Sequence, residues 1–248
     1  MERILAIAID YGAIANPSVA EQLRQACSDD PLCVARRIVG EGAGPARLVQ
    51  VSHPDSDTIR WVKTEPSVTA ARWLSNGQRL IVLDGFGRKV VPELLAALKD
   101  KKASERLVLD LRGNGGGDLG RMLEVASIFI QETKNALYII DKNTRTPIDI
   151  APDQDQGGVV RGGLTLLVGP GTASSAEILA ALLRRHASAR LFGEPTAGKD
   201  YLYRVVPVDH DWRLLLPAEI LVVPGETIAG GLMPDGTIPA ALEAEVAQ

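Results

Sequence analysis

The sequence lacks any long run of apolar residues, although 46% of its 248 residues are hydrophobic. No stretch approaches the roughly 20 consecutive apolar residues that a membrane-spanning helix needs. The longest apolar runs have the length of strands, so the sequence excludes an integral helical membrane protein. A chain of this length and composition predicts a soluble protein with one large domain, or one domain with a small appendage.

An excess of positive charge is also lacking. The sequence has 27 Lys and Arg against 31 Asp and Glu, with a net charge of −4. The basic residues are scattered among acidic ones, so no stripe could neutralise several phosphates at once. We therefore do not expect nucleic acid as a partner.

Cysteine is scarce, with Cys27 and Cys33 as the only two. Their spacing of six residues is compatible with a small disulfide loop or with two unrelated thiols. Two cysteines do not decide the compartment.

The first 78 residues predict an N-terminal helical and hairpin segment. The short apolar run at the N-terminus is interrupted by Asp10, so we interpret it as mature chain and not as a signal peptide. The apolar spacing from Val19 to Ile38 is helical, and a Gly-rich stretch follows it. Residues 46–65 show two short alternating runs around a Pro/Asp/Ser turn, which predicts a hairpin.

From residue 79 on, apolar strand-like runs alternate with amphipathic helical patterns. We expect strands within 79–86, 105–117, 135–141, 164–170 and 189–194, and helices at 90–100, 119–132 and 174–186. From Tyr203 on, short strands and Pro/Gly turns follow. This order predicts an α/β core domain over residues 79–248 with a mainly parallel sheet.

A Gly-rich loop follows one of the buried strands, in the segment DLRGNGGGDLG. Consecutive glycines let main-chain N–H groups face an anionic ligand. Gly115, Gly117 and Gly120 have the GxGxxG spacing of a dinucleotide site, with Asp141 where a ribose-binding acid would lie. Alternatively the loop supplies an amide of an oxyanion hole, or it is a tight turn that needs glycine.

Two serines open the helix that follows the strand at 164–170. A serine at such a turn is exposed beside the positive end of the helix, which favours a developing negative charge. The pattern Ser174-x-x-Glu177 is also that of a capping box, in which the serine only satisfies a helical N–H group.

A nucleophilic serine needs a base, and the three histidines are poor candidates. His186 is twelve residues along the same helix, which separates it from Ser174 by roughly 18 Å. His53 is in the predicted hairpin and His210 in a polar turn, and neither belongs to a recognisable constellation of an acid and a serine. Lys199 ends a Gly/Pro loop after the following strand, but a lysine acts as a base near neutral pH only where an apolar pocket lowers its pKa from about 10.4 to about 7–8.

Three segments together resemble the C-terminal processing (tail-specific) peptidases: LVLDLRGNGGG, TASSAEI and GEPTAGK, in that order. The lysine lies twenty-five residues after Ser174, as in the family pattern. The resemblance implies that Ser174 is the nucleophile and Lys199 the general base. It further implies an oxyanion hole made by the amides of Gly116 and Ser175, and it aligns Glu177 with the glutamate that follows the nucleophile.

The resemblance covers about Leu80 to Pro239 and implies a crotonase-like spiral of β–α units. Two positions depart from the pattern, since Arg185 replaces an aspartate and Tyr203, at a supporting position, replaces a glutamine. No stretch is long enough for a PDZ domain, so we expect a PDZ-less member. The family also implies a periplasmic or secreted location, with which a Cys27–Cys33 disulfide would agree.

The sequence thus predicts a serine endopeptidase that acts on protein or peptide substrates through a Ser-Lys dyad, without metal or organic cofactor. A homo-oligomer or an adaptor partner stays open. The first alternative is a non-catalytic relative that binds peptide ends, which Arg185 and Tyr203 suggest. The second is a nucleotide-binding oxidoreductase, which only the GxGxxG spacing suggests.

Overall fold

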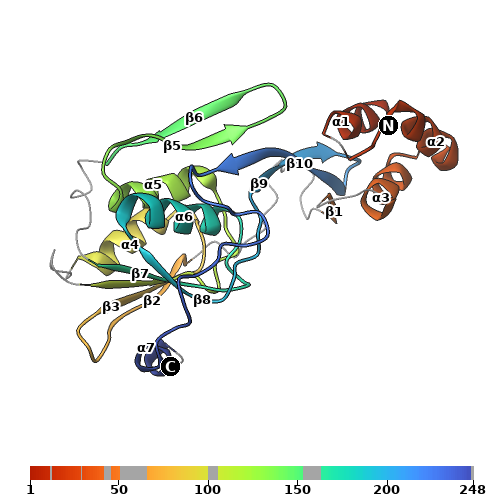
Figure 1. The fold of residues 1–248 in the computed structure, drawn as a ribbon. Helices are drawn as coiled ribbons and strands as arrows, with labels where there is room; N and C mark the ends of the chain where they lie inside the picture. Colours follow the sequence, from red (N-terminus) through yellow and green to blue (C-terminus); the bar gives the residue numbers. More distant parts are fainter. Residues whose placement is uncertain are drawn as a thin grey trace. The chain divides into compact units, whose positions relative to one another are not determined.

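The computed structural model describes residues 1–11, 13–28, 30–41, 46–50, 66–99, 106–152 and 163–246. The chain forms two compact units, whose elements are drawn in Figure 1. The first unit combines Met1–Arg60 with Tyr201–Ile220, and the second combines Trp61–Asp200 with Leu221–Gln248. The first unit therefore includes Tyr201–Ile220, a segment that the sequence analysis assigned to the core domain at 79–248.

Three helices begin the first unit: α1 (Glu2–Asp10), α2 (Pro17–Cys27) and α3 (Pro31–Glu41). Helix α2 starts with proline at its first position and is capped by Asn16, whose side chain accepts the amides of Ser18 and Val19. A disulfide between Cys27 and Cys33 joins the end of α2 to α3. Of the two interpretations of the cysteine pair, the structure has the disulfide loop.

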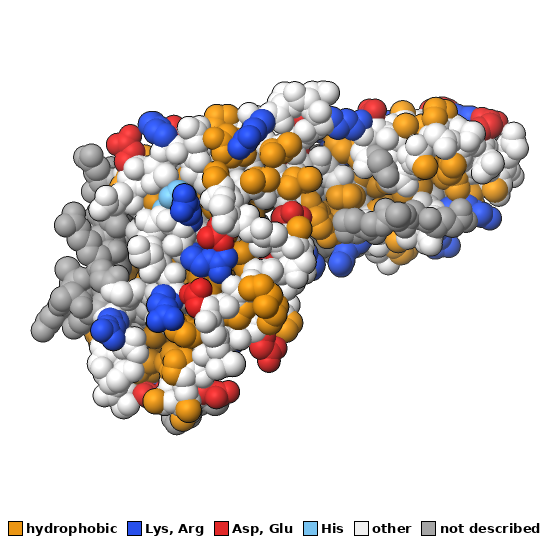
Figure 2. Space-filling model, viewed as in Figure 1, with side chains coloured by type: hydrophobic (Ala, Val, Ile, Leu, Met, Phe, Trp, Pro, Cys, Tyr) orange, Lys and Arg blue, Asp and Glu red, His pale blue; other side chains and the backbone are white. Residues whose placement is uncertain are grey.

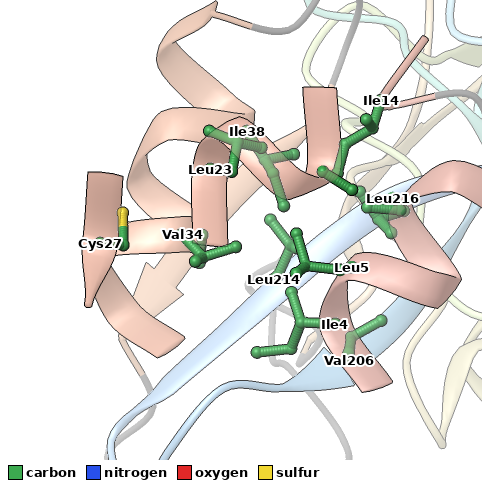
Figure 3. Close-up of a cluster of buried hydrophobic side chains, with 13 residues drawn as sticks. Ile4, Leu5, Ile14, Leu23, Cys27, Val34, Ile38, Val206, Leu214 and Leu216 are labelled. Carbon is green, nitrogen blue, oxygen red and sulfur yellow. The ribbon is translucent and has the colours of Figure 1, made fainter. Parts of the chain in front are cut away.

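Strands complete the first unit: β1 (Arg47–Gln50), β9 (Tyr201–Pro207) and β10 (Trp212–Val222). Strand β10 pairs antiparallel with both β1 and β9. Side chains from the three helices pack on β9 and β10 in the cluster of Figure 3, which includes Leu5, Val34 and Leu214. Of the predicted hairpin at 46–65, only β1 falls within the described residues, and residues 51–65 lie outside them.

The second unit contains a five-stranded sheet in the order β2 (Val68–Trp73), β3 (Arg79–Leu83), β4 (Leu107–Asp110), β7 (Leu164–Val168) and β8 (Arg190–Gly193). Strands β3, β4, β7 and β8 are parallel, and β2 is antiparallel to β3. The prediction of a mainly parallel sheet is therefore confirmed for this unit. Every residue of the central strand β4 is buried, as expected for a parallel strand covered on both faces.

Helices cover both faces of this sheet. Figure 1 shows α4 (Val90–Leu98), α5 (Leu119–Phe129) and α6 (Ser175–Ala187) on one face. On the other face, Leu242 of α7 (Ala240–Val246) joins a cluster with side chains of β3, β4 and β7. This arrangement places the carboxyl ends of β4 and β7 side by side, where the Gly-rich loop and the serine turn follow.

The strand expected at 135–141 is present but does not join the parallel sheet. It is β5 (Thr133–Ile140), which pairs antiparallel with β6 (Arg145–Ile150). The segment of β6 was not among the strands expected from the sequence, because most of its side chains are exposed and it shows little apolar alternation. The prediction that placed the strand at 135–141, now β5, among the alternating β–α units of the parallel sheet was therefore wrong.

The surface agrees with the near balance of charges. On the face shown in Figure 2, Lys and Arg side chains lie among Asp and Glu side chains. In the part of the chain that the structure describes, no helix is both long and apolar enough to cross a membrane.

Candidate active site

Ser174 lies where the buried strand β7 turns into helix α6. Thr172 fixes this turn, because its hydroxyl donates to the carbonyl oxygen of Leu111 at 2.8 Å and accepts the amide of Gly169 at 3.1 Å. Leu111 directly follows β4, so the serine turn is tied to the start of the Gly-rich loop. Thr172 is fully buried, and Ser174 is half-buried.

The backbone of Ser174 is not that of an ordinary helix cap. Its φ of 56° and ψ of −123° lie in a region that non-glycine residues rarely adopt, whereas N-cap residues are normally extended. Such a strained serine between a strand and a helix is typical of a nucleophile held at a sharp turn. The conformation favours a functional role for Ser174 over simple capping.

Ser174 and Glu177 do form the arrangement of a capping box. The carboxylate of Glu177 accepts the amide of Ser174 at 2.8 Å. The amide of Glu177, however, donates to the main-chain carbonyl oxygen of Ser174 at 2.9 Å, and the hydroxyl makes no N-cap hydrogen bond of normal geometry. The Ser174 side chain therefore lies toward the first turn of the helix without a cap hydrogen bond of normal geometry.

Glu177 is fully buried and gathers four donors on its carboxylate. Oε2 accepts the main-chain amides of Ser174 and Lys199, each at 2.8 Å. Oε1 accepts the amide of Gly198 at 2.6 Å and the hydroxyl of Thr196. Because Ser174 and Lys199 share one acceptor atom, their main-chain nitrogens lie within the span of two hydrogen bonds.

The loop that carries Lys199 is fixed from a second side by the C-terminal part of the chain. Thr196 and Leu232 exchange hydrogen bonds, since the amide of Leu232 donates to the Thr196 hydroxyl at 2.8 Å. The amide of Ala197 donates to the carbonyl oxygen of Thr172 at 3.0 Å. Lys199 itself is half-buried, so the apolar enclosure that a basic role requires stays a prediction.

The Gly-rich loop packs directly against the serine. A Cβ on Gly116, whose φ is +101°, would lie 3.0 Å from the Cβ of Ser174 and 3.2 Å from the amide nitrogen of Ser175. The hydroxyl of Ser175 donates to the carbonyl oxygen of Gly117 at 2.9 Å. The two predicted oxyanion donors, Gly116 and Ser175, thus belong to adjoining segments beside Ser174.

The two amides differ in their hydrogen bonds. The amide of Gly116 donates to Oδ1 of Asn114 at 2.9 Å. The amide of Ser175, at the first position of α6, has no acceptor among the described residues, as is usual for the first turn of a helix. Only the Ser175 amide is therefore free for an oxyanion in this structure.

The other residues singled out in the sequence lie elsewhere. Tyr203 is in β9 of the first unit, where its ring stacks edge-to-face on Tyr201. Arg185 is exposed in the last turn of α6. The exposed His210 contacts Asp211, and His53 is outside the described residues.

His186 is not a base for Ser174 either. Burial is the main cause that lowers the pKa of His186, and its Nε2 has no hydrogen-bond partner among the described residues. The residue lies in the last turn of α6, whereas Ser174 precedes the first.

Asp141 does not lie where a ribose would bind. It accepts the amides of Asn143 and Thr144 in the exposed turn between β5 and β6, and these bonds lower the pKa of Asp141. Since β5 is outside the parallel sheet, the geometry of a dinucleotide fold is not formed around this loop.

Three residues that hold the site together were not predicted from the sequence, namely Asn114, Thr172 and Thr196. All three are buried polar residues in or beside the recognised motifs. Their residue types did not indicate this role, because their hydrogen-bond partners include residues of distant segments.

The site is thus a strained serine at a strand–turn–helix junction of an α/β unit, joined to a lysine loop by a buried glutamate. A model of the family described as "Peptidase family S41" matches residues 77–238. The chain therefore belongs to peptidase family S41.

Curated relatives carry names of carboxyl-terminal processing proteases. The "Carboxyl-terminal-processing protease" of Picosynechococcus sp. is 27% identical over 225 residues, which cover 83% of this chain and 51% of that protein. The "Carboxy-terminal processing protease CtpA" of Bacillus subtilis is 34% identical over 121 residues, which cover 48% of this chain and 25% of that protein. The chain spans between a quarter and about half of the length of these two relatives.

Solved structures share the fold. A lipoprotein from Streptococcus agalactiae has a TM-score of 0.71 and 18% identity, with 99% of this chain and 93% of that chain covered. A photosystem II D1 C-terminal processing protease has a TM-score of 0.54 and 23% identity, with 79% and 48% covered. At these identities the likeness concerns the fold alone.

Proposed function

We propose that this chain carries the catalytic site of a serine endopeptidase of the C-terminal processing type, with Ser174 as nucleophile and Lys199 as general base. The observation that carries the proposal is that one oxygen of Glu177 accepts the main-chain amides of both residues. This contact joins two motifs that are twenty-five residues apart in the sequence. The main chains of Ser174 and Lys199 are therefore close together, so their side chains begin near each other.

The chemistry follows from these positions. Oγ of Ser174 attacks the carbonyl carbon of a peptide bond while its proton passes to Nζ of Lys199. The C–N bond then breaks, and the lysine returns the proton to the leaving amine. Water hydrolyses the acyl-enzyme with the lysine again acting as the base.

The oxyanion of the tetrahedral intermediate needs preorganised donors. The amide of Ser175 is suited to this role because it lies at the start of α6 and has no acceptor among the described residues. The amide of Gly116 would act as the second donor when it leaves, or shares, the side chain of Asn114. The supporting role in the proposal falls to Glu177, whose carboxylate accepts the main-chain amides of Ser174 and Lys199.

The proposal extends to the fold and the compartment. Repeated β–α units in the second unit support a crotonase-like spiral. The Cys27–Cys33 disulfide supports an oxidising compartment, such as the periplasm or the exterior of the cell. The names of the relatives support a substrate that is a protein or peptide.

The test is covalent labelling with a serine-directed fluorophosphonate, read by intact mass. We expect one adduct on the wild type and a loss of roughly 100-fold or more in labelling rate for both Ser174→Ala and Lys199→Ala. Ser188→Ala and Lys89→Ala, which remove an exposed serine and an exposed lysine, should label like the wild type. An unlabelled but folded wild type would contradict the proposal and favour the peptide-binding relative.

Endopeptidase activity is tested with an unstructured peptide mixture whose products are sequenced by mass spectrometry. Internal cleavage that disappears in Ser174→Ala is the expected result. Full cleavage by Ser174→Ala would assign the activity to another group.

A further inference from the structure

Asn114 is a fully buried polar residue that joins three parts of the second unit. Its Nδ2 donates to the carbonyl oxygen of Leu83, at the end of β3, at 3.0 Å, and its Oδ1 accepts the amide of Gly116 at 2.9 Å. Its main-chain carbonyl oxygen accepts the amide of Ala173 at 3.0 Å. One residue therefore connects the sheet, the Gly-rich loop and the residue that precedes Ser174.

The Gly-rich loop and the serine turn are packed so closely that no space remains between Gly116 and the residues at 173–175. A Cβ on Gly116 would lie 2.8 Å from the carbonyl oxygen of Ala173 and 3.0 Å from the Cβ of Ser174. A shift of the Gly116 peptide would therefore displace the serine turn directly. Because Asn114 is sealed from solvent, it acts on this region only through its neighbours.

We propose that Asn114 is a positioning residue, whose side-chain amide sets the Gly116 peptide against Ser174 by bonding it to the end of β3. Both side-chain bonds are needed for this role, one as donor and one as acceptor. The kinetic part of the inference rests on the proposed serine chemistry, whereas the structural part does not.

The variant Asn114→Asp separates the two bonds by pH. A protonated aspartate can donate to the Leu83 carbonyl oxygen and accept the Gly116 amide, as asparagine does. An ionised one has no donor and sets a negative charge against that carbonyl oxygen. Burial raises the pKa of such an acid, so the neutral form persists at low pH and is lost as the pH rises.

The measurement is the ratio of labelling rates, Asn114→Asp over wild type, across the pH range in which both are folded. Both proteins have the same general base, so the effect of its titration on the labelling rate is divided out of the ratio. We expect it to approach one at low pH and to fall about tenfold or more at high pH, as a buried hydrogen bond is lost. Simple loss of packing would lower the ratio equally at every pH.

Asn76→Asp is the matched control. Oδ1 of Asn76 accepts the amide of Gln78 at 2.9 Å, which repeats the bond from Gly116 to Asn114 in an exposed turn between β2 and β3. Its labelling ratio should stay near one at every pH.

Amide hydrogen exchange gives a readout that needs no catalysis. We expect faster exchange in Asn114→Asp at high pH within both 111–117 and 172–178, and unchanged exchange in Asn76→Asp. Asn114→Ser provides a second variant, because its hydroxyl can accept the Gly116 amide but is too short to reach Leu83. It should loosen the same two segments at every pH.

A flat ratio together with unchanged exchange in both segments would overturn the inference. If the wild type takes no label, faster exchange in both segments of Asn114→Asp would still support the positioning role, whereas the absent label would count against the serine peptidase proposal. Hydrogen exchange therefore tests the positioning role of Asn114, and labelling of the wild type tests the serine peptidase proposal.

Discussion

At the scale of single residues, the site depends on a carboxylate that faces donors on both oxygens. Glu177 is fully buried, and each of its oxygens accepts at least one main-chain amide. An acceptor-only group meets this set of donors, and no neutral side chain of the same shape does so. Glu177 therefore links the stability of the second unit to the positions of the Ser174 and Lys199 main chains, and so to the proposed dyad.

The substitution Glu177→Gln tests this link. A glutamine must point its NH₂ group at one pair of donors in either orientation, which leaves at least one buried N–H group without an acceptor. We expect a loss of about 2–4 kcal/mol in the free energy of unfolding and a labelling rate reduced about tenfold or more. Denaturant unfolding and fluorophosphonate labelling measure the two effects.

Glu226→Gln is the control for this prediction. Glu226 is a largely buried carboxylate of the same unit that pairs with Arg184, away from the dyad. Its loss should lower stability and leave the labelling rate unchanged. Equal labelling of Glu177→Gln and Glu226→Gln would contradict a role for Glu177 in fixing the dyad.

At the scale of elements, the Gly-rich loop and the serine turn form one packed unit. Gly116 has a positive φ, and an added Cβ would lie 2.8 Å from the carbonyl oxygen of Ala173. The substitution Gly116→Ala must therefore push the serine turn out of place. We expect the labelling rate to fall about 100-fold, since a displacement of about 1 Å can have this effect.

Two other glycines of the second unit distinguish backbone strain from displacement of the serine turn. Gly77 also has a positive φ, of +77°, but an added Cβ would meet nothing within 4 Å, and the same open space surrounds Gly115. Gly77→Ala should lower stability by about 1 kcal/mol without changing the labelling rate, and Gly115→Ala should label normally. A normal labelling rate in Gly116→Ala would show that the loop does not constrain Ser174.

At the scale of the whole molecule, the chain divides into two compact units that are stabilised differently. The first unit is built around three short helices, the Cys27–Cys33 disulfide and one hydrophobic cluster. The disulfide closes a loop of only a few residues, yet such loops still contribute about 2 kcal/mol by restricting the unfolded chain.

We expect the double substitution Cys27→Ala/Cys33→Ala to destabilise the first unit by about 2 kcal/mol. Hydrogen exchange should become faster in α1, α2 and α3 and stay unchanged in β3, β4 and β7 of the second unit. Uniformly faster exchange in both sets of elements would show that the two units unfold together.

The sequence by itself predicted the parallel β–α order of β3, β4, β7 and β8 in the second unit, and it proposed Ser174 and Lys199 as a dyad. Buried parallel strands appear as continuous apolar runs, and the spacing of Ser174 and Lys199 is a local property of the chain. The disulfide stayed open at that stage, because spacing alone is compatible with both states of Cys27 and Cys33.

Only the tertiary structure decided which contacts make these motifs one site. Capping was the alternative for Ser174 from the sequence, and the backbone conformation of Ser174 and the bond from the Lys199 amide to Glu177 favour a functional role. The pairing of β5 with β6 and the recruitment of Tyr201–Ile220 into the first unit also depend on partners far along the chain. A local sequence pattern indicates which face of a helix or strand is apolar. The hydrogen-bond donors of the buried Glu177 and the pairing partner of the exposed strand β6 come from other segments, so they are decided only when those segments pack together.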